Sequence, residues 1–302
     1  MEYTNKSNGK KSNCISKLTE EEVHRYTDFG FLVPIRILTE EKANELRLAV
    51  DEYLFEHVET PKYELTDPIR IKRNIDSSGK TTFEYGEGTD SKPKTFPFLF
   101  NLWKRDKRFE TVAKDPSIAL IASQLLEGKK VHLMEDNVII KNPFAKSIPW
   151  HQDFPYWPLA TPTATTIFIA LDAVTTENGT MQVVPGSHKR NEETLPVGFG
   201  DDKSIMQKDR PNAVEISQNP TLEGLEVVDY GNIEPGECGI HHAMLWHGSL
   251  PNLTSKPRCV YVLRYVAEGT IWLGNERFPY DEVGLKPGDK IGGVHFPIVP
   301  TE

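Results

Sequence analysis

Two separate segments of the sequence contain residue types that can bind a divalent metal ion. His151 and Asp153 stand two positions apart, so on an extended strand both side chains project from one face and can chelate a single ion. His247 lies far along the chain and can join them when a second strand folds beside the first. Two imidazoles and one carboxylate form the facial triad of non-haem Fe(II) oxygenases, which leaves coordination positions open for a cosubstrate and dioxygen. These residues predict a reactive metal site, although a histidine near an aspartate is more often an ordinary hydrogen-bonded pair.

Arg258 is a second residue whose position indicates chemistry. It follows His247 by eleven residues and begins an apolar run that continues through residues 259–263. An unpaired guanidinium is costly at the start of a buried strand, and a planar carboxylate is its natural bidentate partner. If one end of an organic diacid chelates the metal, Arg258 can hold the carboxylate at the other end. The alternative is an interior arginine that pairs with a structural Asp or Glu.

Three segments carry a resemblance to a known family. They read WHQDFPYWP at 150–158, ENGTMQVVPGSHK at 177–189 and HGSLPNLTSKPR at 247–258. In residue type, order and spacing they resemble the phytanoyl-CoA dioxygenase family of Fe(II)- and 2-oxoglutarate-dependent oxygenases, over roughly residues 130–267. The resemblance implies a mainly β fold with flanking helices, in which a double-stranded β-helix of the jelly-roll, cupin-like type has N-terminal helices packed on its outside.

The resemblance also implies roles for individual residues. It assigns three catalytic Fe(II) ligands, which are His151, Asp153 and His247. Arg258 is expected to bind the distal carboxylate of 2-oxoglutarate, and dioxygen is the second cosubstrate. Gln152 and Ser249 fall where relatives also contact 2-oxoglutarate, and Phe168 falls where relatives carry an aromatic wall. Because halogenating relatives replace the ligand carboxylate by a small residue, the intact Asp153 favours oxygenation.

Aromatic residues and two irregular segments are candidates for substrate binding. Phe154, Tyr156 and Trp157 directly follow Asp153, so they either line the pocket near iron or pack in the core. Residues 63–103 and 190–218 lack regular patterning, and long loops of this kind in a compact enzyme are either lids or solvated insertions.

Composition excludes several other classes of protein. The formal net charge of -9 and the pI near 5.6 argue against a nucleic-acid partner, which requires a basic face. Three widely separated cysteines form no CxxC pair, and Cys238 and Cys259 are expected to be small buried hydrophobic residues. No apolar run has the length of a signal peptide or a membrane span. We therefore expect a cytoplasmic protein with a small-molecule substrate and no membrane partner, as a monomer or homodimer.

The elements that position these residues follow from the hydrophobic pattern. Thr19 and Glu22 form a capping box that begins one helix, Thr39 precedes a second, and Asp115-Pro116 begins a third that ends near Gly128. Strands are expected at residues 137–140, 165–171, 182–184, 225–228 and 259–266. Short strands without long intervening helices indicate a sandwich or barrel. We expect a flexible segment at 1–18 and a single domain at 19–302, with a helical part at 19–128 and a β core at about 130–267.

Three neighbouring histidines are weaker candidates for a function. His241 and His242 lie on the strand that leads to His247, so they are expected to pack or to support the metal ligands, and His188 is expected in a structural loop. The leading hypothesis is hydroxylation of an unactivated C–H bond in a small organic molecule, such as an amino acid or specialised metabolite, with release of succinate and CO2. The same chemistry can instead end in desaturation or oxidative ring closure. Alternatives from other classes are a noncatalytic β-helix binding module and a Zn(II) or Mn(II) cupin isomerase or hydrolase, which would leave Arg258 without a purpose.

Overall fold

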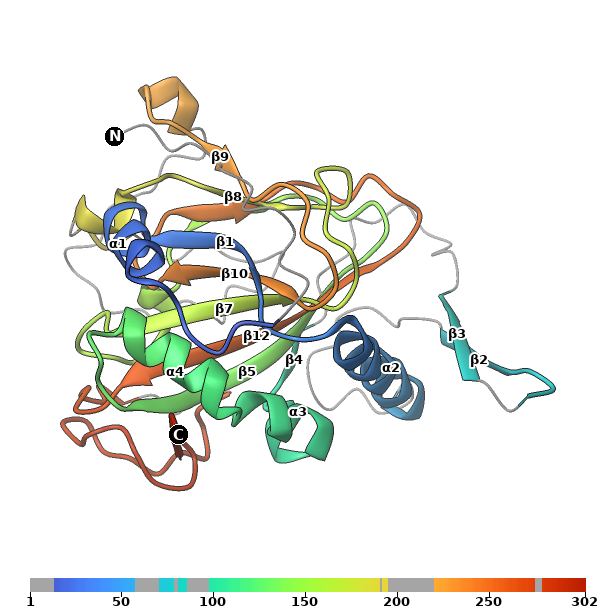
Figure 1. The fold of residues 1–302 in the computed structure, drawn as a ribbon, viewed down its shortest axis with the longest axis horizontal. Coiled ribbons are helices and arrows are strands. Elements are labelled where there is room, and N and C mark those ends of the chain that lie inside the picture. The colour runs from blue at the N-terminus through green and yellow to red at the C-terminus, as the bar shows by residue number, and fades with distance from the viewer. Residues whose placement is uncertain are drawn as a thin grey trace.

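Two antiparallel β-sheets face each other at the centre of the molecule (Figure 1). The computed structural model describes residues 14–57, 71–78, 81–85, 98–190, 192–194, 220–274 and 279–302. Buried apolar residues of the smaller sheet, such as Val183, pack against interior residues of the larger one, such as Phe168 and Val262. This two-layer arrangement of antiparallel strands is the expected double-stranded β-helix.

The larger sheet has the strand order β1-β10-β7-β12-β5-β13, with β4 also paired to β5. Its strands are β1 (Phe31–Arg36), β4 (Phe98–Phe100), β5 (Val131–Lys141), β7 (Ala164–Ala170), β10 (Glu237–His242), β12 (Arg258–Ala267) and β13 (Ile298–Val299). The long strand β12 lies at the middle, where it pairs with β5 on one side and β7 on the other. Residues directly opposite in such a ladder have their side chains on the same face.

The smaller sheet has the order β6-β11-β8-β9, and its strands are β6 (Ile148–His151), β8 (Met181–Val183), β9 (Val228–Asp229) and β11 (His247–Ser249). A separate hairpin pairs β2 (Ile71–Ile75) with β3 (Thr81–Tyr85). Four 3-10 turns complete the described elements, at Leu102–Lys104, Phe154–Tyr156, Ser187–Arg190 and Pro220–Glu223.

Four α-helices form where the sequence supplies caps. They are α1 (Glu20–Phe29), α2 (Glu40–His57), α3 (Lys107–Ala113) and α4 (Pro116–Leu125). The capping box of Thr19 and Glu22 is present, and Asp115 caps α4 with Pro116 in its first turn. All three predicted helices are therefore confirmed, whereas α3 was not predicted. In Figure 1 these helices cover the outer face of the larger sheet.

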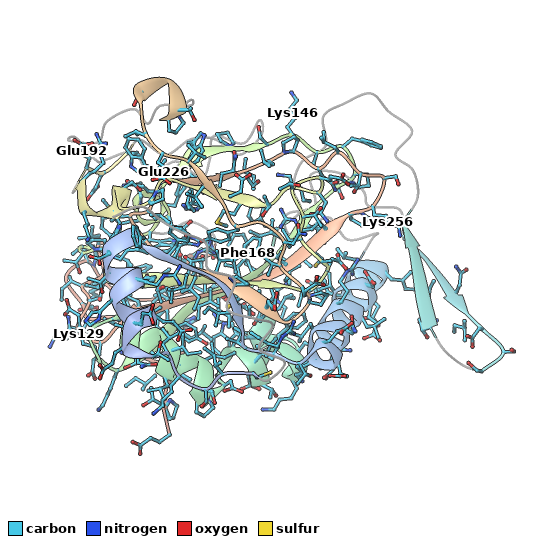
Figure 2. All side chains as sticks on the ribbon, turned by 45° about the horizontal axis from the view of Figure 1, so that its top comes forward. Lys129, Lys146, Phe168, Glu192, Glu226 and Lys256 are labelled. Atoms are coloured by element: carbon cyan, nitrogen blue, oxygen red, sulfur yellow. The ribbon has the colours of Figure 1, made fainter. Side chains whose placement is uncertain are left out.

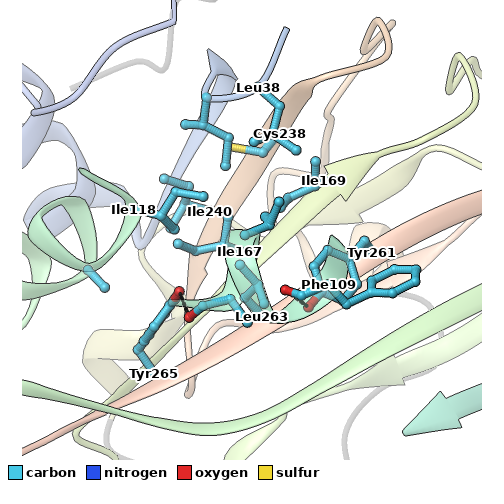
Figure 3. Close-up of a cluster of buried hydrophobic side chains, with 14 of the residues drawn as sticks. Leu38, Phe109, Ile118, Ile167, Ile169, Cys238, Ile240, Tyr261, Leu263 and Tyr265 are labelled. Carbon is cyan, nitrogen blue, oxygen red and sulfur yellow. Dashed lines mark hydrogen bonds between the residues drawn. The ribbon is translucent and has the colours of Figure 1, made fainter. Parts of the chain in front are cut away.

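The main apolar core lies between that outer face and the helices (Figure 3). Ile167, Ile240 and Leu263 project from neighbouring strands toward Ile118 of α4. Cys238 and Cys259 are fully buried, as predicted. Within the described residues, Ile15 and Leu18 already contact the core, and the proposed boundary between residues 18 and 19 stays a prediction. None of the helices in the described ranges is long and apolar enough to cross a membrane.

Candidate metal centre

The three predicted metal ligands lie together between the two sheets. His151 ends β6 and His247 begins β11, and the two are directly paired in the antiparallel ladder. Asp153 begins the 3-10 turn that follows β6, and the Phe154 backbone amide donates to the Ala243 carbonyl, which fixes this turn. One ligand atom from each of the three side chains lies within 4.8 Å of the other two. The tertiary structure therefore brings together residues that are almost 100 positions apart in sequence.

Both histidines are oriented by hydrogen bonds to the backbone. Nδ1 of His151 lies 2.8 Å from the Pro149 carbonyl oxygen, and Nδ1 of His247 lies 2.9 Å from the Leu245 carbonyl oxygen. Because a carbonyl can only accept, each Nδ1 must carry the proton. The lone pair of each neutral ring is therefore on Nε2, which is the arrangement that a metal-binding histidine requires.

Among the described residues, Asp153 accepts hydrogen bonds through one of its two carboxylate oxygens. Its Oδ2 accepts from Thr166 Oγ1 at 2.6 Å and from His241 Nε2 at 3.1 Å. Its Oδ1 lies 3.7 Å from His247 Nε2 and 3.7 Å from Arg264 Nη2, distances too long for hydrogen bonds. The support role predicted for His241 is thus present, while Thr166 and Arg264 were not predicted.

Burial and neighbouring charges set the protonation of the site. Burial lowers the pKa of His151. Burial, and then the charge of His151, lower the pKa of His247 well below its usual range. Burial alone would raise the pKa of Asp153, but Arg264 and the hydrogen bond from His241 outweigh it and hold that pKa well below its usual range. Two neutral imidazoles and one carboxylate result, which is the protonation state that binds a metal.

A buried ion-pair network supports Asp153 from the larger sheet. Arg264 Nη1 donates to Glu135 Oε1 at 2.8 Å, and the Tyr280 hydroxyl donates to Glu135 Oε2 at 2.6 Å. Arg264 and Glu135 are paired in the ladder between β12 and β5, so both side chains lie on its interior face. The network connects the ligand Asp153 to the C-terminal segment that contains Tyr280.

Arg258 lies on the same strand as Arg264, six positions earlier, and is 1% exposed. Its guanidinium lies 5.5 Å from the centre of the Phe168 ring, and its Nη2 donates to the Gly179 carbonyl oxygen at 3.1 Å. Its buried Nε and Nη1 have no hydrogen-bond partner among the described residues. Burial lowers the pKa of Arg258 to about 10. The side chain predicted to be an aromatic wall, Phe168, lies inside the molecule beside this arginine (Figure 2).

Ser249 lies at the same end of the site and accepts a hydrogen bond from Lys141 Nζ at 2.7 Å. Lys141 was not predicted as a site residue. A lysine at the end of an apolar run has the pattern of a strand that ends in solvent, yet its exposed fraction is 0%. The feature that places Lys141 at this site is its register opposite Arg258, and that register depends on the pairing of β5 with β12.

The side-chain amide of Gln152 binds backbone groups of two other segments. Its Nε2 donates to the carbonyls of Glu192 and Met244, both at 2.9 Å, and its Oε1 accepts from the Thr194 amide at 2.9 Å. The Gln152 amide therefore links the backbone of residues 192–194 to that of Met244. A contact between Gln152 and 2-oxoglutarate stays a prediction.

The three aromatic candidates differ in their surroundings. Phe154 and Trp157 are buried in an apolar cluster with Trp272 of the C-terminal segment, and Phe154 also lines a pocket with His242 and Met244, so the core alternative is favoured for Trp157 alone. Arg264 also lies 5.6 Å from the centre of the Trp157 ring. Tyr156 is half-buried and meets the His151 ring edge-on, with the ring centres 6.0 Å apart. The Tyr156 ring therefore contacts the ring of a predicted metal ligand.

His188 and His242 lie outside the metal centre. Their rings are 5.1 Å apart, and they line a pocket with Lys189 and Met244 that contains none of the three candidate ligands. His188 is on the 3-10 turn at Ser187–Arg190, and its Nε2 donates to the Thr27 carbonyl. His242 Nδ1 accepts from the Met244 amide, so this side chain orders the chain before β11.

The residues present fit both a ferrous ion and 2-oxoglutarate. Two imidazole nitrogens and one carboxylate oxygen are the donor set of a facial triad, and they leave the other coordination positions free. Nε and Nη1 of Arg258, which lack a partner among the described residues, match the two oxygens of a carboxylate. No carboxylate of the described residues occupies this position.

Comparison with known proteins gives the same family. The model of the phytanoyl-CoA dioxygenase family matches residues 26–260. A probable alpha-ketoglutarate-dependent hypophosphite dioxygenase of Stutzerimonas stutzeri is 28% identical over 146 residues, which are 46% of each chain. L-proline trans-4-hydroxylase of Streptomyces griseoviridis is 28% identical over 167 residues, 50% of this chain and 59% of the relative. The match thus spans about half the length of these curated relatives.

A solved structure shows the same fold over nearly the whole chain. The non-heme alpha ketoglutarate dependent carbocyclase SnoK from nogalamycin biosynthesis superposes with a TM-score of 0.68 at 22% identity, and the match covers 94% of this chain and 98% of SnoK. At this identity the likeness concerns the fold alone. The family match over most of the sequence, together with the converging triad, shows that the chain belongs to the phytanoyl-CoA dioxygenase family of Fe(II)- and 2-oxoglutarate-dependent oxygenases.

Proposed function

We propose that this Fe(II)- and 2-oxoglutarate-dependent oxygenase hydroxylates an unactivated C–H bond of a small organic molecule, with release of succinate and CO2. The single observation that carries the proposal is the convergence of His151, Asp153 and His247 in one buried place, in a fold that also buries the partnerless donors of Arg258. A free amino acid or a specialised metabolite is the proposed substrate class. The Streptomyces relative that is named a proline hydroxylase supports amino acids as the first compounds to test.

The proposed roles follow from the contacts of each side chain. His151 and His247 would hold the ferrous ion through Nε2, and Asp153 would hold it through Oδ1. Arg258 orients 2-oxoglutarate through its distal carboxylate. When bound, the ferrous ion and its cosubstrates supply the oxidising chemistry, for which no side-chain nucleophile or general base is required. The surrounding apolar residues keep water from the reacting atoms.

Desaturation or oxidative ring closure is the alternative outcome of the same chemistry. The same ligand set serves these reactions, and a structure named as a carbocyclase shares the fold. A noncatalytic binding module is disfavoured because it has no chemical need for an intact triad together with a buried arginine. We further propose that residues 19–302 form one oxygenase domain. The monomeric or homodimeric state and the cytoplasmic location stay predictions.

Anaerobic addition of Fe(II) and 2-oxoglutarate tests the proposed function. We expect a weak visible charge-transfer band from the chelate, which Asp153→Ala abolishes and Arg258→Ala weakens at limiting 2-oxoglutarate. Lys256→Ala is the matched control, because it removes an exposed cation two positions before Arg258 (Figure 2). Amino acids, acyl-CoA esters and terpenoid or alkaloid acids are then screened for stimulated succinate release. The oxygenase proposal fails if the wild-type protein gives no band and no compound stimulates succinate formation.

A further inference from the structure

A pocket of about 440 Å³ lies at the end of β10, and one of its walls adjoins the metal centre. That wall is apolar and contains Phe154, Pro162 and Met244. Phe154 directly follows the predicted ligand Asp153, and its amide donates to the Ala243 carbonyl just after β10. A volume of this size is typical of pockets that hold a small organic molecule.

The strand registers place this pocket and Arg258 on opposite sides of Asp153. Arg258 begins β12, and this end of the strand pairs with the last residues of β7. Thr166, which donates to Asp153 Oδ2, lies near the start of β7. Thr165 precedes it and is paired with His242, which ends β10 and lines the pocket. Because 2-oxoglutarate is proposed to extend from the metal toward Arg258, the pocket lies on the side that is left for the substrate.

The polar wall of the pocket presents groups of opposite charge. Lys189 and Glu193, which are four positions apart, both line it. Lys189 Nζ is paired with Asp28 Oδ1 at 3.0 Å, and because an ammonium has three donors, this exposed pair leaves others for a ligand. Glu193 would repel a ligand that carries only a negative charge, and Lys189 would repel one that carries only a positive charge. The two side chains therefore favour a ligand with both charges.

His242 adds a neutral hydrogen-bond donor to the same wall. Its Nδ1 accepts from the Met244 amide at 3.1 Å, so the proton of the neutral ring is on Nε2. Burial, and then the charge of His188, lower the pKa of His242 to about 3, which keeps the ring neutral. Its Nε2 forms no hydrogen bond within the described part of the chain and can donate to a carboxylate. His188 offers no such donor, because its Nε2 donates to the Thr27 carbonyl and its Nδ1 is buried against Gly30.

We infer that this pocket binds the substrate and that the substrate is a free amino acid with an apolar side chain. Lys189 and Nε2 of His242 bind its carboxylate, and Glu193 accepts from its ammonium. Its side chain packs against Phe154 and Met244, on the wall that adjoins the metal centre. The inference rests on the proposed function, which leaves amino acids and specialised metabolites open, and it names the side chains that select between them.

Anaerobic titration of the protein loaded with Fe(II) and 2-oxoglutarate tests the inference, with the visible charge-transfer band as the readout. The probes are L-alanine, L-valine, L-leucine, L-isoleucine, L-proline, L-methionine and L-phenylalanine. Each one that shifts the band is compared with analogues that lack either its ammonium or its carboxylate, which for L-leucine are isocaproate and isopentylamine. We expect at least one amino acid to shift the band, and each of its analogues to bind about tenfold or more weakly.

Two variants assign the charges of that amino acid to single side chains. Glu193→Gln should raise the Kd of the amino acid about tenfold, but it should bind the analogue without an ammonium as well as the wild type does, or better. Lys189→Met should raise the Kd of the amino acid and leave the Kd of the analogue without a carboxylate unchanged. Glu192→Gln is the matched control, since Glu192 is exposed one position earlier and does not line the pocket, and its Kd values should equal those of the wild type (Figure 2).

The outcomes separate this inference from the proposed function. A band that forms with 2-oxoglutarate but responds to none of the amino acids overturns the inference while the proposed function stands. Analogues that bind as tightly as the amino acid, or unchanged Kd values in Glu193→Gln and Lys189→Met, overturn it in the same way. If the wild type gives no band and no compound stimulates succinate release, the proposed function fails as well.

Discussion

Asp153 shows how single residues prepare the metal centre. Thr166 and His241 both bind its Oδ2, and these two residues are paired between β7 and β10, so their side chains approach the carboxylate from the same face. The bonds fix the rotation of the carboxylate and leave Oδ1 directed toward His247. Groups that orient a ligand in this way contribute to metal affinity without touching the ion.

Replacement of His241 should therefore weaken metal binding without removing a ligand. We expect His241→Phe to reduce the affinity for Fe(II) about 10- to 100-fold, because Asp153 loses one of its two hydrogen bonds. His242→Phe is the matched control, since His242 lies beside it but contacts the Met244 amide and the His188 ring instead. Anaerobic competition with a coloured Fe(II) chelator measures both affinities. Equal losses in the two variants would show that the effect is structural.

At the scale of elements, periodicity located β7, β8 and β12 to within one residue and missed the polar part of β5, whereas the strand expected at 225–228 was wrong except at Val228, where β9 begins. The strand expected at 137–140 is β5, which begins six residues earlier at Val131. Glu135 and Asp136 interrupt its apolar pattern, yet both are buried because Arg264, Tyr280, Tyr261 and the Trp103 amide bind them. These partners come from distant segments, so local sequence could not indicate that the carboxylates are compatible with a central strand.

The missed edge strand has a related cause. The strand β1 contains Pro34, and proline argues against a strand unless the strand lies at the edge of a sheet. β1 is at the edge, where it pairs only with β10. The metal ligands and Arg258 could be predicted because their spacing is local or shared with a family. Lys141, Thr166 and Arg264 could not, because their positions depend on which strands pair.

The turn that contains Gly179 packs against Lys141 and accepts a hydrogen bond from Arg258, and it should not tolerate a side chain. Gly179 has a φ of 100°, and an added Cβ would lie 2.6 Å from Lys141 Cδ and 2.8 Å from the Leu250 carbonyl oxygen. We expect Gly179→Ala to lower the free energy of unfolding by about 1–3 kcal/mol beyond the backbone cost and to raise the Kd of 2-oxoglutarate. Urea unfolding and calorimetry measure the two effects.

Gly269→Ala separates backbone strain from steric contact. Gly269 has a similar φ of 90°, but no atom lies within 4 Å of its added Cβ. Its alanine variant should therefore show the backbone cost alone and bind 2-oxoglutarate as the wild type does. If Gly179→Ala is no less stable than Gly269→Ala, the close packing of Lys141 against this turn is not important for the fold.

At the scale of the whole molecule, both faces of the larger sheet bury ionisable groups. The interior face carries Glu135, Lys141, Arg258 and Arg264, which surround the proposed site. The outer face carries Asp136, which is 0% exposed among the helices and accepts hydrogen bonds from the Tyr261 hydroxyl at 2.6 Å and the Trp103 amide at 2.9 Å. Burial raises the pKa of Asp136 to about 7, although these two hydrogen bonds oppose the shift. Its protonation is therefore linked to the stability of the whole fold.

The stability of the wild-type protein should fall as the pH rises through 7 because Asp136 must then ionise in the core. The folded-state pKa of about 7 lies above the unfolded value near 3.8, so the folded state binds the proton more tightly and gains stability at low pH. That contribution is complete below the unfolded pKa and is lost once the pH exceeds the folded pKa. Between pH 6 and pH 8.5 ionisation of this single group should lower the unfolding free energy by about 1 kcal/mol.

Asp136→Asn should remove this part of the pH dependence. The amide oxygen can still accept from Tyr261 and Trp103, but the side chain cannot ionise. We therefore expect its unfolding free energy, measured with urea, to rise relative to wild type by about 1 kcal/mol between pH 6 and pH 8.5. Asp281→Asn, at an exposed position, should follow the wild type at both pH values. A constant difference between Asp136→Asn and wild type would mean that Asp136 has the same protonation state at pH 6 and pH 8.5, and that its burial is not what limits stability in alkali.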